Sequence, residues 1–489
     1  MLDEATLRGR ARAGVVLLAG RTVLQQLTIL VGNVYLARLL GPREFGAFWI
    51  VQFALSFFTL FGDAGLGAAL IQKKDAATQE ELSSVFWFQV LLGLVVALVV
   101  SSLAPWVVTF WADLPKGADQ MLRALSLELL LTSLRVIPAI LLERELLFGR
   151  LAVLDLVLTI SFYGSAVVLA HLGYGPYALV AAVLIQAIAG IAAAYSFRPW
   201  LPSFQCKVAI LRPVLKFGVV FQAKHIVGFV NGAVMPLYAG RALGSYALGI
   251  VSWSQNTAFF PLRIVDILAR VNFPLLSRLQ HDHEAFARSF ERTIQTCATV
   301  TLLVVALFLG LGPAVVQVIY GDKWMPALPT LYVFAAAISI GFLVSIVNSA
   351  LDAIGQPRIM MRLGIYWTIL NWLTITAVMQ FRKDALSFSL AYCVHILFGN
   401  LAVLFAVKKV LPTAHLWPRI RVALASAIGT AVVARWVLLP WITGPATLTV
   451  AVLAIIAVFG GVVALLDRSA LVELLALVQR NPKSANNGG

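Results

Sequence analysis

Apolar runs of about 20 residues recur almost end to end along this chain, and they limit what it can fold into. Of the 489 residues, 61% are hydrophobic and 12% are charged, whereas soluble globular chains carry about 45–50% apolar and about 25% charged residues. Inside a bilayer every backbone amide and carbonyl must be bonded within the protein, so spanning segments form helices or a closed barrel. Because the runs are continuous rather than alternating, we expect an all-α polytopic membrane protein.

Length and hydropathy predict about fourteen transmembrane helices. Three charged residues, Arg123, Glu128 and Arg135, interrupt the fourth, which makes it the least apolar. The expected spans are 13–38, 45–71, 83–111, 120–141, 151–171, 176–196, 214–239, 245–272, 292–319, 328–353, 359–380, 385–407, 419–440 and 446–466.

One short motif occurs twice. Residues 35–46 read YLARLLGPREFG and residues 238–249 read YAGRALGSYALG, at an offset of 203 residues without a gap. Each copy closes one apolar run and opens the next, so each is predicted to be a helix–turn–helix. A repeat of this period in an apolar chain is typical of transporters built from two similar helix bundles.

The repeat divides the chain into four parts. We expect an N-terminal six-helix lobe at 1–200, a C-terminal six-helix lobe at 201–411, two additional helices at 412–467 and a cytoplasmic tail at 468–489. The basic, proline-containing segment RPWLPSFQCKVAILRP (198–213) joins the lobes. Six spans separate the motif copies, and an even number puts both copies on one side of the membrane, as parallel repeats require.

The net charge of +15 is distributed as in a membrane protein. The cations form no patch interleaved with aromatic residues, so nucleic acid is not an expected partner. They gather in alternate short loops, for example at Arg8, Arg10 and Arg12 and at Arg144 and Arg150. The positive-inside rule then predicts that both termini are cytoplasmic, in a multi-pass protein whose neighbours are membrane lipids.

Motifs of enzymes, cofactor sites and metal sites are not found in the sequence. Three cysteines, Cys206, Cys297 and Cys393, lie far apart and form no CxxC pair. The HDHE run at 281–284 spaces its histidines two apart, whereas helical metal pairs need three or four. With no P-loop, GxGxxG, GxSxG or HExxH motif, we expect a protein that is not an enzyme and holds no cofactor or metal.

Charges inside apolar runs are the candidate site residues, because they are costly in a bilayer and usually face a cavity or a partner. The offset of the repeat aligns Arg21 with Lys224 and Asp63 with Asp266. Cations gathered between two lobes would suit an anionic ligand such as pyrophosphate; Lys216 alternatively extends to the cytoplasmic headgroups. The predicted substrate-binding residues are Arg21, Lys216, Lys224, His225, Arg263, Asn33 and Asn231.

Two carboxylates are candidates for ion coupling. Asp63 lies in FGDAGLGAAL, where it either binds a proton or cation or pairs with a neighbouring cation. Asp266 lies between Arg263 and Arg270, at spacings that favour a local ion pair. Asn33 and Asn231 either bind sugar hydroxyls or form hydrogen bonds between helices.

Several segments together resemble a known family. They are VYLARLLGPREFGAFWIV, LFGDAGLGAALIQKK, SSVFWFQ, LKFGVVFQ, NFPLLSRLQ, YGDKWMPALP and ALDAIGQPR, between residues 34 and 358. The chain resembles the Wzx-type oligosaccharide and polysaccharide flippases of the MOP superfamily, in the branch that includes the colanic-acid exporter.

The resemblance implies two six-helix lobes and two C-terminal helices in the bacterial inner membrane. It implies flipping of an undecaprenyl-diphosphate-linked oligosaccharide for exopolysaccharide or lipopolysaccharide assembly, with rocking of the lobes. A polysaccharide polymerase, a chain-length regulator and a coupling H+ or Na+ are the implied partners. Two alternatives stay open: a multidrug/cation antiporter of the same superfamily, which would favour a carboxylate-rich cavity, and a membrane enzyme, for which no large loop or motif is present.

Overall fold

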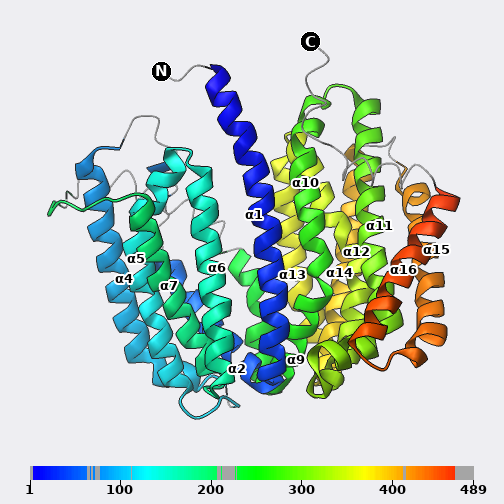
Figure 1. Ribbon diagram of the computed structural model, residues 1–489, viewed down its shortest axis with the longest axis horizontal. Coiled ribbons are helices and arrows are strands. Elements are labelled where there is room, and N and C mark those ends of the chain that lie inside the picture. Colours follow the sequence, from blue (N-terminus) through cyan, green and yellow to red (C-terminus); the bar gives the residue numbers. More distant parts are fainter. Residues whose placement is uncertain are drawn as a thin grey trace. The chain divides into compact units, whose positions relative to one another are not determined.

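The computed structural model describes residues 4–62, 67, 70–71, 77–111, 113–205, 207, 211, 226, 228–410 and 415–467. Within these ranges the chain is helical and contains no β-strand (Figure 1). Ten of the described helices are long and apolar enough to cross a membrane. The predicted all-α, multi-pass architecture is therefore confirmed, whereas the count of fourteen stays a prediction.

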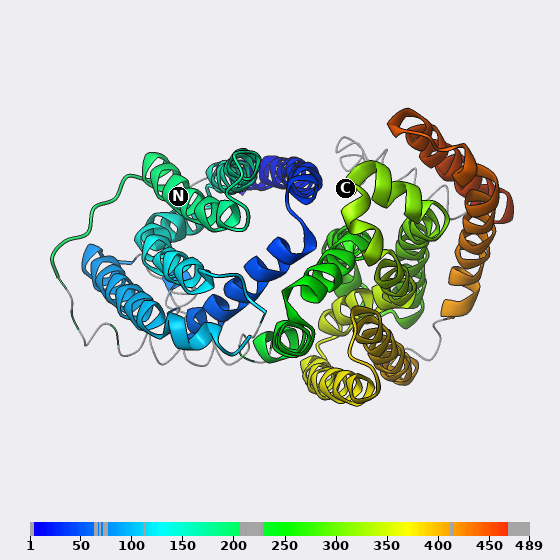
Figure 2. The ribbon, with the colours of Figure 1, turned by 90° about the horizontal axis from the view of Figure 1, so that it is seen from below.

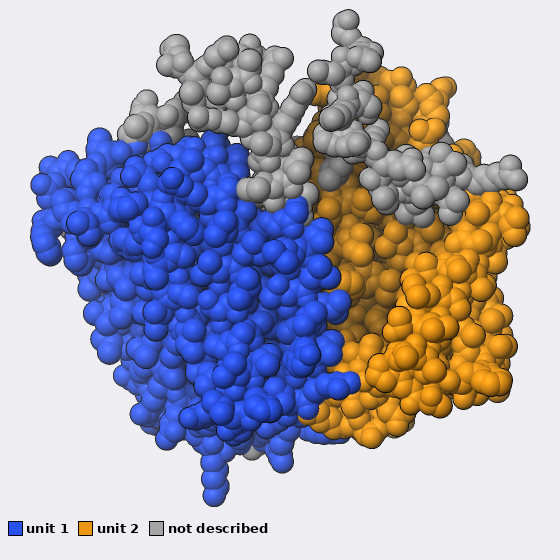
Figure 3. All heavy atoms as spheres, in the orientation of Figure 1, with its two compact units in different colours: residues 1–249 blue, residues 250–489 orange. Residues whose placement is uncertain are grey.

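The chain divides into two compact units, residues 1–249 and 250–489 (Figure 3). Unit 1 therefore contains both copies of the repeated motif, and α9 runs across the boundary between the units. The elements of unit 1 are α1 (Glu4–Leu39), α2 (Pro42–Gly62), α4 (Gln79–Val108), α5 (Ala118–Arg144), α6 (Phe148–His171), α7 (Tyr177–Phe197), a π-helical turn (Met235–Ala239) and the start of α9 (Gly240–Ala258).

Unit 2 is built around α11, which packs against α10, α12, α15 and α16. The last two helices lie along one edge of this unit (Figure 2). Gly310 of α11 lies against Ala434, just beyond the end of α15, where a Cβ on the glycine would come within 2.5 Å of the Ala434 Cβ. The helices of unit 2 are α10 (Phe260–Arg278), α11 (His283–Val315), α12 (Leu328–Ala353), α13 (Pro357–Phe381), α14 (Ala385–Val410), α15 (Leu416–Val433) and α16 (Pro445–Leu466).

Capping residues and proline decide where several helices begin. Thr78 and Glu81 form a capping box at the start of α4. Asp282 caps α11, because its side chain accepts a 2.9 Å hydrogen bond from the Ala285 amide. The predicted single span 245–272 is wrong in one respect: the helix is broken at Phe259, between α9 and α10. Pro261 lies in the first turn of α10, where its missing N–H costs no hydrogen bond.

Both copies of the repeated motif turn at matched positions. In the first copy, α1 ends at Leu39 and α2 begins at Pro42, so the turn falls at 40–41. In the second copy, the backbone leaves the helical conformation at Gly244, with φ 82° and ψ 176°. Gly41 and Gly244 occupy the same place in the repeat, and Gly244 has the positive φ that glycine adopts without strain. The predicted helix–turn–helix is confirmed for both copies.

The two copies also touch each other, through their closing glycines. A Cβ added to Gly46 would lie 1.7 Å from the carbonyl oxygen of Ser245. A Cβ added to Gly249 would lie 1.8 Å from the carbonyl oxygen of Pro42. Pro42 and Ser245 are equivalent positions of the repeat, so the contact is reciprocal and joins backbone to backbone.

The loop between α4 and α5 ties the two copies together. Asp113 accepts a 2.5 Å hydrogen bond from Arg43 of the first copy, and Ser245 of the second copy donates to its carbonyl at 3.0 Å. Trp111 Nε1 donates to the Pro236 carbonyl at 3.0 Å. The hydrogen bond from Arg43 is the main reason that the pKa of Asp113 lies below its usual value.

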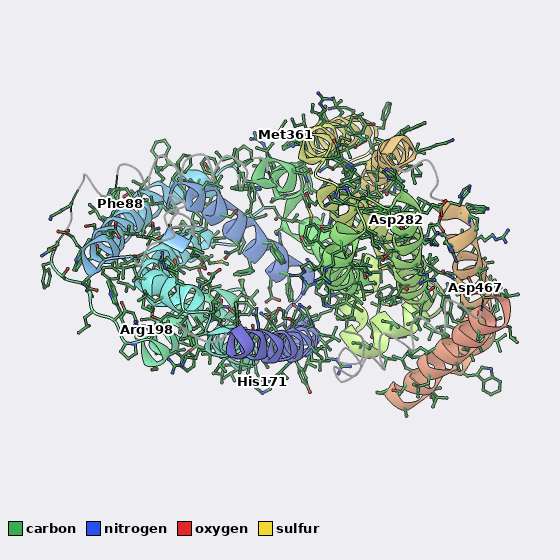
Figure 4. All side chains as sticks on the ribbon, turned by 90° about the horizontal axis from the view of Figure 1, so that it is seen from above. Phe88, His171, Arg198, Asp282, Met361 and Asp467 are labelled. Atoms are coloured by element: carbon green, nitrogen blue, oxygen red, sulfur yellow. The ribbon has the colours of Figure 1, made fainter. Side chains whose placement is uncertain are left out.

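The segment after α7 is held along the first turns of α4. Trp200 Nε1 donates to the Gln79 side chain at 2.8 Å, and Trp87 Nε1 donates to the Ser203 carbonyl at 2.9 Å. The exposed ring of Phe204 stacks on Trp87, with the ring centroids 5.6 Å apart. This part of the predicted lobe linker is therefore an ordered part of unit 1; Arg198, at its start, is labelled in Figure 4.

A polar cluster joins α15 and the end of α16 to α11. Glu291 of α11 has a side chain only 11% exposed, and it accepts hydrogen bonds from Arg419 Nε at 3.2 Å and from the His415 amide at 2.7 Å. Gln295, one helical turn further along, donates to Asp467 at 2.5 Å. These contacts fix the two additional helices at one end of unit 2.

Candidate functional site

An ion pair joins α1 and α6 within their apolar runs, about one turn from the start of the run of α6. Arg21 and Asp155 approach to 2.6 Å, with side chains 25% and 35% exposed. Among the described residues, no acceptor reaches the buried Nε of Arg21. The guanidinium carries five donors, and its partly exposed end is the part that an anionic group could reach.

Further polar contacts follow the same helix pair. Gln25 donates to Thr159 at 3.1 Å, and Asn33 donates to the hydroxyl of Tyr163 at 3.2 Å. Gly32 makes room for the tyrosine, since a Cβ there would lie 2.2 Å from the Tyr163 ring. Asn33 thus takes part in an interhelical hydrogen bond, which is one of the two roles expected for it.

Two charged residues of α5 extend the ion pair. Glu128 and Arg135 are seven residues apart, or about two helical turns, so they lie on one face of α5. Arg135 is near enough to Asp155 and Glu128 to interact electrostatically with both, although it forms no ion pair with either within 4.0 Å. Gly190 of α7 gives Arg135 its space, because a Cβ there would come within 3.3 Å of the guanidinium.

Together these residues form the α1–α5–α6 charge network, which we define as Arg21, Asp155, Arg135 and Glu128. Positive and negative groups alternate along it, so its formal charge is zero when all four are ionised. Charges inside an apolar bundle are costly unless they are paired or face a water-filled cavity, and Arg21–Asp155 is the ion pair of this set.

Sequence reasoning identifies only one member of this network. Arg21 is predicted to bind substrate, while Glu128 and Arg135 stand out only as interruptions of an apolar span. A signal for a further member is present in the sequence, because Asp155 is a lone carboxylate within the apolar run 151–171. What the sequence does not show is that α1, α5 and α6 bring these four groups together.

Other predicted site residues lie elsewhere or outside the described residues. Arg263 and Asp266 are on α10 in unit 2, and the half-buried Asn231 is in unit 1 just before the π-helical turn. Asp266 accepts a 2.5 Å hydrogen bond from Ser345 of α12. The HDHE run supplies the helix cap at Asp282, and no metal-binding group of His, Cys, Asp or Glu is found among the described residues. Lys216, Lys224, His225 and Asp63 lie outside the described residues.

A second buried polar set lies between α13 and α14. His395 is 2% exposed, and neither ring nitrogen has a hydrogen-bond partner among the described residues. Its ring packs edge-on against Trp367, with centroids 4.6 Å apart, and against Tyr392, with centroids 5.4 Å apart. These surroundings are aromatic and uncharged, so they do not resemble the network of unit 1.

Comparison with known families shows which family the chain belongs to. The family described as polysaccharide biosynthesis protein matches residues 35–329, which is more than half of the chain. The chain belongs to this family. The match begins at the first copy of the repeated motif and extends through the second, so the resemblance found in the sequence is confirmed.

Individual relatives have low sequence identity to this chain, between 24% and 26%. The teichuronic acid biosynthesis protein TuaB of Bacillus subtilis is 25% identical over 312 residues, which are 62% of this chain and 62% of TuaB. The succinoglycan biosynthesis transport protein ExoT of Rhizobium meliloti is 26% identical over 71% of this chain and 69% of its own length. The lipopolysaccharide biosynthesis protein WzxC of Escherichia coli is 24% identical, over 70% and 69%. The chain thus spans about three fifths to two thirds of the length of these relatives.

Solved structures show the same fold. The lipid II flippase MurJ, in an inward closed conformation, matches with a TM-score of 0.71 at 16% identity, over 94% of this chain and 100% of MurJ. An inward-facing multidrug resistance MATE family transporter of the MOP superfamily matches with a TM-score of 0.60 at 13% identity, over 82% of this chain and 100% of its own. These likenesses, at 13–16% identity, show the fold of the chain.

Proposed function

We propose that this protein flips an undecaprenyl-diphosphate-linked oligosaccharide from the cytoplasmic to the periplasmic leaflet of a bacterial inner membrane. The family, the names of the relatives and the flippase-like fold support this proposal. Alternating access, by rocking of two lobes at 1–200 and 201–411, is the expected mechanism. Both termini are then cytoplasmic, and a polymerase and a chain-length regulator act on the product.

The observation that carries the proposal is the placement of Arg21. Its guanidinium lies within the apolar run of α1, where the side chain is 25% exposed and pairs with Asp155. The diphosphate of a lipid-linked sugar is a diester with two fixed negative charges, and a guanidinium binds phosphate oxygens with paired hydrogen bonds. Lys224, at the equivalent place of the repeat, and Arg263 are proposed to complete the cationic site, with Lys216, His225, Asn33 and Asn231 around it.

A second candidate function rests on two carboxylates. Glu128 and Asp155 lie within apolar helices, as the binding site of a cation antiporter would require, and the MATE transporters share the fold. Both are accompanied by an arginine, however, so the network offers no net negative charge to a cationic drug. We therefore place the antiporter second.

Complementation of export tests the proposal. In a strain that lacks the gene, Arg21→Ala combined with Lys224→Ala should abolish polymer export while the protein still inserts at normal levels. Arg288→Ala is the matched control, since this arginine is exposed and pairs with Glu284 one turn away. Normal export by the double variant at normal protein level would refute the cationic site. Loss of drug resistance, with export intact, would favour the antiporter.

A further inference from the structure

The segment that follows α7 presents two large apolar side chains outward. Leu201 is 80% exposed and Phe204 is 94% exposed, whereas Trp200 beside them is 9% exposed and packs edge-on against Phe86 of α4. The segment passes along the outer side of α4 (Figure 2). A leucine and a phenylalanine three residues apart, both held away from the protein, indicate an apolar partner.

The face of α4 on which the segment lies is the face that meets lipid. The ring of Phe204 stacks on Trp87, and the residues that follow Trp87 on the same side of the helix are exposed and apolar. They are Leu91, Leu94, Val95 and Leu98, with exposed fractions of 40–60%. Because α4 is long and apolar enough to cross a membrane, a stripe of this kind packs against acyl chains.

The two tryptophans of α4 fix the depth of the segment. Trp106, which is 79% exposed, lies near the opposite end of the helix from Trp87. A rise of about 1.5 Å per residue separates the two indoles by about 28 Å along the helix axis, close to the hydrocarbon thickness of about 30 Å. Tryptophan concentrates at both membrane interfaces, so Trp87 and the stacked ring of Phe204 lie at one of them.

Side chains of α4 satisfy the backbone of the segment, as an irregular chain at this depth requires. Gln79 Nε2 donates to the Leu201 carbonyl at 2.7 Å. The Ser203 amide donates to Ser83 Oγ at 2.9 Å, and the Ser203 carbonyl accepts from Trp87 Nε1 at 2.9 Å. These hydrogen bonds hold the segment in one conformation and leave its apolar side chains facing outward.

The charges of the segment do not favour an anionic lipid. Arg198 Nη2 pairs with Glu145 at 2.9 Å, and Lys207 pairs with Glu80. Cations that already have carboxylate partners add little attraction to anionic headgroups. The contact with the membrane is therefore expected to be apolar rather than electrostatic.

We propose that residues 198–205 are a membrane-interface anchor of unit 1, in which Leu201 and Phe204 insert between the headgroups and the acyl chains of the phospholipid bilayer. The anchor involves no transported substrate, so it goes beyond the proposed function. It fixes the chain that leaves α7 to the membrane surface beside α4, instead of leaving it free in water as a loop between two lobes.

Fluorescence quenching locates the two side chains. Phe204→Cys and, separately, Leu201→Cys would be made in the full-length protein with its native cysteines replaced by serine, labelled with an environment-sensitive dye and reconstituted into phosphatidylcholine vesicles. Lipids with a nitroxide near the headgroup should quench both labels about twofold more than lipids with a nitroxide near the end of the acyl chain. Aqueous iodide should quench them weakly. His281→Cys, exposed in the turn after α10, is the control and should respond to iodide alone.

A further variant tests how α4 holds the segment. Ser83→Ala removes the acceptor of the Ser203 amide, and an unsatisfied amide is costly away from water. Iodide quenching of the label at position 204 should therefore rise towards the value at position 281. Thr109→Ala is the matched control: its hydroxyl bonds the Trp106 carbonyl at the other end of α4, so the label should not respond.

The outcomes are distinguishable from those for the transport proposal, since no export is measured. A label at position 204 that iodide quenches as strongly as the label at position 281 would refute the anchor. A label that neither iodide nor nitroxide lipids reach would also refute it, because a second copy or another protein would then cover the segment. Stronger quenching by nitroxide lipids after addition of phosphatidylglycerol would show an electrostatic contact in place of the apolar one.

Discussion

Gly46 faces the carbonyl oxygen of Ser245 so closely that any side chain at position 46 would overlap it, at 1.7 Å from the Cβ. The equivalent pair, Gly249 and Pro42, shows the same approach at 1.8 Å. Residues about 200 positions apart thus meet backbone to backbone, and each copy of the motif supplies both a glycine and a carbonyl.

Replacing either glycine should destabilise unit 1. We expect Gly46→Ala and Gly249→Ala each to lower the free energy of unfolding by about 3 kcal/mol, because a backbone contact cannot be relieved by a change of rotamer. Thermal unfolding of the detergent-solubilised protein measures the loss. Gly164→Ala on α6 is the control: nothing lies within 4 Å of a Cβ added there, and alanine favours the helix. Equal stability of Gly46→Ala and Gly164→Ala would contradict the close contact.

Removing the charge of Asp113 should weaken the link between the motif copies in a pH-dependent way. The pKa of this carboxyl is lowered in the folded protein, mainly by Arg43, so its stabilising effect is present above the usual value of 3.8 and disappears as the pH falls through the lower folded value. Because the pair is largely exposed, we expect Asp113→Asn to cost only about 0.5–1 kcal/mol at pH 7. The difference in melting temperature from the wild type should vanish in acid.

The matched variant for this test is Asp352→Asn, at an exposed position at the end of α12. Its melting temperature should follow the wild type at both pH values. A destabilisation by Asp113→Asn that persists unchanged in acid would show that the hydrogen bonds of the loop backbone, rather than the carboxylate, hold the two copies.

Loss of Arg419 should loosen the two additional helices. Glu291 is nearly buried, and Arg419→Ala removes one of its two hydrogen-bond donors described above and leaves the His415 amide. Breaking a buried pair from one side costs about 3–5 kcal/mol; at these exposures we expect about 2 kcal/mol. Limited proteolysis should cut the α14–α15 connection faster. The exposed pair Arg288–Glu284 serves for comparison, and Arg288→Ala should change stability by less than about 0.5 kcal/mol.

Replacing His395 by phenylalanine should stabilise the protein, whereas the variants described above destabilise it. Its two ring nitrogens are buried without described partners, so His395→Phe keeps the ring contacts and removes two desolvated polar atoms. We expect this change to raise the free energy of unfolding by about 1 kcal/mol. His395→Ala, which removes the ring, should lower it by about 2–4 kcal/mol. A fall of similar size in both variants would show that the nitrogens are bonded in the membrane-embedded protein.

The helices are well predicted from the sequence because each apolar run is long and separated from the next by polar residues. The turn of each motif copy is predicted because each copy closes one apolar run and opens the next. The break at Phe259 is not, since the run 245–272 is read as one apolar span and only Pro261 marks the interruption.

The candidate site was predictable only in part, for a physical reason. An arginine in an apolar segment needs a partner, so Arg21 could be recognised from its own surroundings in the sequence. Its partner could not, because Asp155 lies on another helix and the pairing depends on how α1 and α6 pack. The same holds for Asp266, whose hydrogen bond to Ser345 joins two helices.

The reciprocal glycine contact also limits which residues the two copies of the motif can carry where they meet. Here a side chain gained by either copy would collide with the main chain of the other, and no substitution in the second copy could make room for it. A side chain is therefore excluded at both glycines, which accounts for one identical pair of the repeat, Gly46 and Gly249.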